Sequence, residues 1–166
     1  MIKNTELVYL SEKQSMLDNY IIKSKQITVN DDVKKKKRIA FMVELFEFIN
    51  EEKSFKYWSN KRNINQNDLI EEFIDGIHFI ISIGNDLSFN FNDHKDNYFK
   101  NNIDDCIIDI IEKFNTFNKK LDTITYDEML TSFLNIGFNL NFQTDEILKI
   151  YNEKNKKNFE RQDNGY

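Results

Sequence analysis

The 166-residue sequence has no proline and only 4 glycines, so it is short of the residues that hairpins and tight turns require. Its single cysteine, Cys106, cannot form an internal disulfide, and two histidines are too few for a histidine-rich zinc site. The sequence also lacks a signal-peptide core, and no apolar run approaches the roughly 20 residues that span a bilayer. We therefore expect a helical protein of the cytoplasm, or of the host cytoplasm if a phage encodes it.

Positive charge is also scarce. The net charge is −5, whereas proteins that bind nucleic-acid backbones carry a surplus of lysine and arginine. A glycine-rich phosphate loop is missing as well. We expect no direct nucleic-acid binding and no membrane association. A phosphate-bearing ligand would need divalent cations between its oxygens and the carboxylates of the protein.

What the sequence does contain is helical periodicity. Apolar residues, among them 15 phenylalanines, recur at helical spacing in long segments that polar connections separate. The pattern predicts an all-α bundle of about six helices in a single domain over residues 1–166. The expected helices span 5–27, from caps at Asp31 and Asp32 to about 52, about 67–87, about 96–121, one that starts with a Thr125–Glu128 capping box, and one capped by Thr144.

Two of these helices carry acidic residues three positions apart, Glu44 with Glu47 and Glu72 with Asp75. Residues at this spacing project from the same side of a helix, and the rest of each helix is largely apolar. Clustered carboxylates raise one another's pKa unless a cation lies between them, and oxygen-only ligands suit a hard ion. The pattern predicts a hard divalent ion such as Mg²⁺ held between two central helices. The competing interpretation is that each acidic strip is simply a solvated helix face.

Other polar residues receive simpler interpretations. His78 lies about 60° from Asp75 around its helix, so it either faces a ligand or makes a structural hydrogen bond. His94 lies in a polar connection and is expected to be exposed. Cys106 is expected in the core, and the basic run 34–38 is interpreted as a solvated face rather than an anion site.

Five segments carry a resemblance to a known family. They are Gln14-x-x-Leu17-Asp18, Val43-Glu44-Leu45-Phe46-Glu47, Ser54-Phe55-Lys56-Tyr57-Trp58-Ser59, residues 71–79, and the polar tail 151–166. Together they resemble the dimeric all-α dUTPase family (dUTP diphosphatase), in its short phage-like or Firmicutes-like branch. That family is part of the all-α NTP pyrophosphohydrolase group, which includes MazG-like proteins. The acidic pairs are typical of the whole group, whereas segment 54–59 and the tail are specific to dUTPases.

The resemblance implies a homodimer that hydrolyses dUTP, and also dUDP, to dUMP with release of pyrophosphate or phosphate. It implies that Glu44, Glu47, Glu72 and Asp75 bind two or more Mg²⁺ ions, with Mn²⁺ as a substitute, and that Glu44 or Glu47 also orients the attacking water. The implied phosphate ligands are Lys56, Lys154, Asn158 and Arg161. The implied nucleoside-binding residues are Gln14, Asp18, Trp58, His78, Phe79, Tyr151 and Asn155.

Alternatives stay open at this point. Many members of the family have asparagine where this chain has Asp18, and aspartate occurs in the short branch that the chain resembles. A MazG-like or dCTP-directed pyrophosphohydrolase would use the same metal site with another base pocket. A non-enzymatic helical module would instead bind a protein through its phenylalanine-rich faces. If a phage encodes the protein, the resemblance also implies a repressor protein of a mobile element as a partner.

Overall fold

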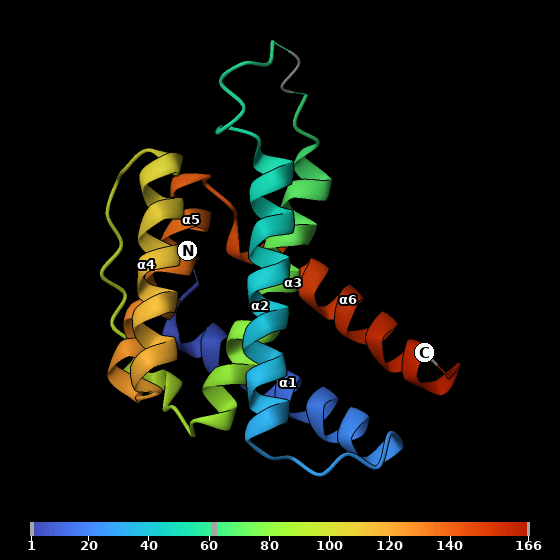
Figure 1. Ribbon diagram of the computed structural model, residues 1–166. Helices are drawn as coiled ribbons and strands as arrows, with labels where there is room; N and C mark the ends of the chain where they lie inside the picture. Colours follow the sequence, from blue (N-terminus) through green and yellow to red (C-terminus); the bar gives the residue numbers. More distant parts are fainter. Residues whose placement is uncertain (1, 61–62, 166) are drawn as a thin grey trace.

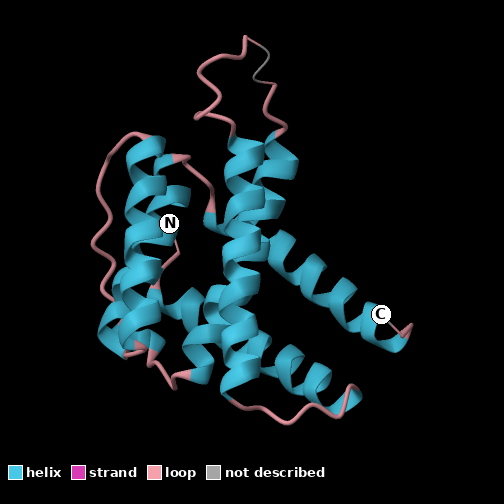
Figure 2. Cartoon of the chain, viewed as in Figure 1, coloured by secondary structure: helices cyan, strands magenta, loops and turns pink. Residues whose placement is uncertain are grey.

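A computed structural model describes residues 2–60 and 63–165. This part of the chain is helical and contains no strand, as expected for an all-α bundle (Figures 1 and 2). Its elements are α1 (Asn4–Ser24), α2 (Asp31–Glu52), α3 (Gln66–Asp86), the short 3₁₀ helix η1 (Phe91–Asp93), α4 (Ile103–Lys120), α5 (Thr123–Asn139) and α6 (Thr144–Asp163). None of these helices is long and apolar enough to cross a membrane.

Helix α3 is the centre of the bundle. It packs along α2 and also contacts α1, α5 and α6, while α4 and α5 form a second pair (Figure 1). The core between these helices is aromatic: Phe73 of α3 stacks on Phe133 of α5, with ring centroids 4.7 Å apart. A side chain at Gly76 could not fit, because its Cβ would lie 2.6 Å from the Phe133 ring. Glycine at this position therefore lets α3 and α5 approach each other closely beside Asp75.

The fourth helix was predicted to begin near residue 96, but it begins at Ile103. The preceding residues, 95–102, form no helix and run alongside α5. Their backbone is held by side chains of that helix, since Phe99 N–H donates to Asn135 Oδ1 and Asn101 N–H donates to Asn139 Oδ1. These long-range hydrogen bonds replace the helical ones, and Asn102 then caps α4.

Three predicted helix caps were also wrong by a few residues. The side chain that caps α2 is Asn30 rather than Asp31 or Asp32. Helix α5 is capped by Asp122, which accepts from the backbone N–H and the hydroxyl of Thr125. Thr144 is the first residue of α6, after an N-cap at Gln143 that makes no side-chain capping bond. In each case the predicted cap lies inside the helix, and the N-cap is an earlier residue whose backbone is in the β region, as is typical of an N-cap.

Two polar residues lie deeper than predicted. His94 is buried, not exposed, because its ring bonds to Asp127 (Nδ1 to Oδ1, 2.6 Å) and to the hydroxyl of Tyr98 (Nε2 to O, 3.2 Å). Lys37 belongs to the basic run 34–38, which was predicted to be a solvated face, but its side chain lies between Asp18 and Asp86. Cys106 is buried, as predicted.

Candidate metal and nucleotide site

The two acidic pairs face each other because α2 and α3 pack side by side. One carboxylate oxygen each of Glu44, Glu72 and Asp75 lies within 4.8 Å of the other two, and all three residues are half-buried. Glu47 lies outside this trio and is exposed, where it borders an open hollow of about 580 Å³ together with Glu72. The fold thus gathers three of the four predicted metal ligands into one group, which we call the carboxylate cluster, with the fourth at its edge.

The carboxylate cluster is electrostatically strained when no cation is present. Burial, reinforced by the charges of Asp75, Glu47 and Glu72, raises the pKa of Glu44 to about 7. Burial and the Asp75 charge also raise the pKa of Glu72. A cation at this point would favour the charged forms of all these groups. Because the donors are carboxylate oxygens alone, the cluster fits a hard divalent ion such as Mg²⁺.

Helix α6 brings positive charge to the carboxylate cluster. Lys154 is ion-paired with Asp75, and its Nζ lies 3.6 Å from an oxygen of Glu71. A small polar cleft of about 100 Å³ continues from this pair along α6, lined by Glu71, Asp75, Lys154, Lys157, Asn158 and Arg161. The three phosphate ligands predicted on the tail therefore share one cleft beside the carboxylates. Lys157 was missed, although its spacing of three from Lys154 indicates the same face.

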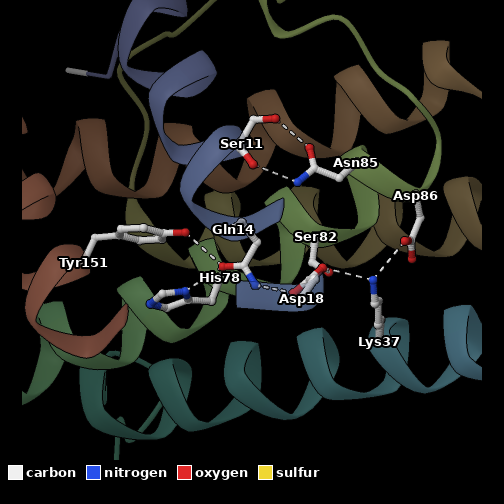
Figure 3. A network of polar contacts seen from close by, with 9 residues as sticks. All are labelled: Ser11, Gln14, Asp18, Lys37, His78, Ser82, Asn85, Asp86 and Tyr151. Carbon is white, nitrogen blue, oxygen red and sulfur yellow. Dashed lines mark hydrogen bonds and ion pairs between the residues drawn. The ribbon is translucent and has the colours of Figure 1, made fainter. Parts of the chain in front are cut away.

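A hydrogen-bonded group lies where α1, α3 and α6 meet (Figure 3). Gln14 Oε1 lies 2.8 Å from His78 Nδ1 and accepts a hydrogen bond from the Tyr151 hydroxyl at 2.9 Å. The His78 and Tyr151 rings stack with centroids 4.1 Å apart. Burial, aided by the Lys154 charge, lowers the pKa of His78 to about 3, so its imidazole is neutral. Four of the predicted nucleoside-binding residues, these three and Asn155, are thus buried on facing helices.

Comparison with known proteins adds an independent finding. A family model for dUTPase matches residues 6–166, nearly the whole chain. The chain belongs to the dimeric all-α dUTPase family. It is therefore an enzyme that hydrolyses dUTP. A search of curated proteins found no match.

The segment 54–59, on which the resemblance to dUTPases partly depends, lies apart from the carboxylate cluster. It follows α2 at the outer end of the α2–α3 pair (Figure 1). Lys56 donates to the carbonyl and side-chain oxygens of Asn50, and Trp58 packs edge-on against Phe55 and Tyr57 while 65% exposed. Neither Lys56 nor Trp58 forms a hydrogen bond or ion pair with the cluster.

The remaining nucleoside candidates lie near the group of Figure 3. Phe79 is half-buried against the core on α3. Asp18 is half-buried one turn after Gln14, and its Oδ1 accepts from Gln14 Nε2 at 2.7 Å. The same carboxylate accepts from Ser82 and from Lys37. Sequence spacing gave no signal for Lys37, because its partners belong to α1 and α3.

Proposed function

We propose that this dUTPase converts dUTP to dUMP and pyrophosphate, and dUDP to dUMP and phosphate, with Mg²⁺ held by Glu44, Glu47, Glu72 and Asp75. The observation that carries the proposal is the convergence of Glu44, Glu72 and Asp75 within 4.8 Å of one another. Mn²⁺ would substitute, because it accepts the same oxygen ligands. The whole of residues 1–166 would act as one domain in the cytoplasm.

The carboxylates would hold the metal and activate the attacking water. When bound, Mg²⁺ supplies positive charge that polarises the phosphoanhydride and stabilises the charge that develops on its oxygens. Glu44 or Glu47 accepts a proton from the attacking water. Glu47 is suited to this role by its exposure beside Glu72, and Glu44 by its place in the carboxylate cluster. Both glutamates therefore stay candidates for the base.

Substrate binding would use the surfaces on either side of the carboxylate cluster. We assign the phosphates to the positive face of α6 with Lys154, Asn158 and Arg161, and to Lys56, since lysine and arginine donate charge-assisted hydrogen bonds to phosphate oxygens. The nucleoside would lie on the other side of the carboxylate cluster, at His78. Its pocket would be formed by Gln14, Asp18, His78, Phe79, Tyr151 and Asn155. Trp58 and Lys56 stay proposed contacts of the substrate, although segment 54–59 lies apart from the carboxylate cluster.

We further propose that a second copy of the chain covers an apolar stripe on α2. Ile39, Met42, Val43 and Phe46 recur at helical spacing, and Phe46 is 49% exposed. Val43 and Phe46 also border the hollow at Glu47, so the stripe adjoins the proposed metal site.

Light scattering should show a dimer that Phe46→Glu converts to a monomer. Ile124→Glu, at an apolar residue on α5 that is 73% exposed, should leave the mass unchanged; a wild-type monomer would refute the dimer.

The function is tested by product release from dUTP, dUDP, dCTP, dTTP and UTP with Mg²⁺, with Mn²⁺ and with EDTA. We expect turnover of dUTP and dUDP, none in EDTA, and near-complete loss of activity in Glu47→Gln. Glu12→Gln, a substitution at an exposed glutamate of α1, is the matched control and should behave as wild type. Turnover of another nucleotide without dUTP would refute the proposed substrate, and full activity of Glu47→Gln would refute the proposed ligand set.

A further inference from the structure

The hydrogen bonds of Figure 3 have directions that chemistry fixes, starting at Lys37. Its ammonium can only donate, and it donates to Asp18 Oδ2 at 3.1 Å and Asp86 Oδ1 at 2.9 Å. Burial alone would lower the pKa of Lys37, but the two aspartates together raise it, so the lysine stays charged. Asp18 thus accepts from Lys37 through its carboxylate.

The charge on Asp18 orients the Gln14 side chain. Asp18 Oδ1 lies 2.7 Å from Gln14, so the amide must present its NH₂ group to the carboxylate. The opposite end of the amide is consequently the oxygen, which only accepts. The hydroxyl of Tyr151 donates to this oxygen, and His78 Nδ1 lies 2.8 Å from it. The hydrogen of the neutral imidazole must therefore be on Nδ1.

This arrangement leaves His78 Nε2 with a bare lone pair. The residue is 5% exposed, and Nε2 has no hydrogen-bond partner among the described residues. One turn beyond Tyr151 on α6, Asn155 Nδ2 is also buried and makes no hydrogen bond of good geometry, although the side chain lies close enough to the Tyr151 hydroxyl to oppose the rise in that group's pKa. Buried polar atoms are seldom left unpaired, because each loses its water without replacement. An unpaired acceptor and an unpaired donor on facing helices indicate a ligand that carries both complements.

We infer that Lys37, Asp18 and Gln14 are positioning residues that hold His78 as its Nδ1-protonated tautomer, so that Nε2 accepts a hydrogen bond from N3–H of uracil. The inference rests on the proposed function and deepens it. Asn155 Nδ2 would donate to a neighbouring carbonyl oxygen of the base. Cytosine has a lone pair on N3 in place of the hydrogen, so it would meet His78 with two acceptors opposed. Asp18 would thus serve the base indirectly, through Gln14.

The tautomer can be observed without nucleotide. In protein labelled with ¹⁵N-histidine, long-range ¹⁵N–¹H spectra distinguish protonated from unprotonated ring nitrogens, and the chain has only two histidines. With His94→Gln for assignment, we expect His78 to carry its hydrogen on Nδ1. Asp18→Leu and Gln14→Leu should give a mixture of tautomers.

Ser11→Ala is the control on the same helix, because it removes the Ser11–Asn85 hydrogen bond without touching the chain of contacts to His78. It should leave the tautomer unchanged. Wild-type His78 protonated on Nε2, or a single Nδ1 tautomer that survives both leucine variants, would overturn the inference. If a leucine variant does not fold, Gln14→Met, which removes the acceptor of His78 Nδ1 with little change in side-chain volume, provides the same test.

Base recognition is tested with dUMP and N3-methyl-dUMP as probes. We expect dUMP to shift the His78 Nε2 signal in the direction of an accepted hydrogen bond, and the methylated nucleotide to leave it in place. Asp18→Leu should raise KM for dUTP about tenfold with little change in kcat, as for the loss of a binding contact. An unshifted Nε2 signal in protein that turns over dUTP would overturn the inference alone. Absence of dUTP turnover in the wild type would overturn the proposed function, while the nucleotide-free spectrum would still report the tautomer.

Discussion

The carboxylate cluster and the contacts from Lys37 to His78 both involve helix α3, but the cluster brings like charges together whereas Lys37 pairs with opposite ones. In the cluster, Glu44, Glu72 and Asp75 gather like charges, and the pKa values of both glutamates are raised. Around Lys37, one ammonium is shared between two aspartates, and the buried atoms of this network left unpaired among the described residues are Asp86 Oδ2 at one end and His78 Nε2 at the other. The comparison favours the proposal that cations from outside bind the cluster, whereas the Lys37 network takes its positive charge from the chain itself.

The largest effect is expected from Glu44→Gln, which separates stability from activity. Removal of a metal ligand should reduce dUTP turnover by roughly 100-fold or more. The same change removes a repelling charge, so the midpoint of thermal unfolding in EDTA should rise rather than fall. Activity assays and calorimetry measure the two effects. A variant that is both less active and less stable would mean that the cluster is not strained without its cations.

Lys37→Met should have the opposite signature. It leaves two aspartates without their shared cation, at a site where the lysine side chain is only 15% exposed, so we expect a loss of about 3 kcal/mol in unfolding free energy. Urea denaturation measures it. The neighbouring Lys36→Met removes an exposed pair with Asp32 and should cost less than about 0.5 kcal/mol. Equal effects for the two lysines would contradict the distinction between the two regions.

The contrast also explains what the sequence could predict. The acidic pairs were found because partners three residues apart on one helix are fixed by local geometry. The helices that carry them were placed almost to the residue, at 31–52 and 66–86. The burial of Lys37 depends instead on Asp18 and Asp86, which lie on other helices. A local pattern of five basic residues could not distinguish Lys37 from its solvated neighbours.

The same reason accounts for the other errors. The start of α4 was misplaced because Asn135 and Asn139, more than 35 residues further along, bond the backbone of the preceding segment. His94 was misjudged because its partner Asp127 is on α5. Side-chain hydrogen bonds between distant segments compete with local helix formation, and they cannot be predicted from the sequence pattern near residue 96 alone.

The next prediction concerns pH, which acts on the carboxylate cluster through Glu44. Its pKa in the folded protein is about 7, above the ordinary value of 4.5. The folded state therefore holds this proton more tightly than the unfolded state, and stability without metal should fall as pH rises from about 4.5 to 7. Mg²⁺ must displace the proton, so its affinity should fall roughly tenfold per pH unit below 7. Titration calorimetry at pH 6 and 8 tests this, and an affinity independent of pH would contradict it.

The smallest effect is expected from Lys154→Met, which changes the residue between the carboxylate cluster and the cleft along α6. Lys154 is half-buried between Asp75 and the proposed phosphate cleft, where it competes with a metal ion for the same carboxylate. Its removal should tighten Mg²⁺ binding two- to fivefold when no nucleotide is present, the range of a partly exposed ion pair of about 0.5–1 kcal/mol. Nucleotide affinity should weaken, because the same ammonium would bind a phosphate oxygen once the metal takes its place. Lys157→Met lacks the Asp75 contact and should weaken nucleotide binding alone. If Lys154→Met weakens both ligands, the lysine supports the carboxylate cluster instead of competing for it.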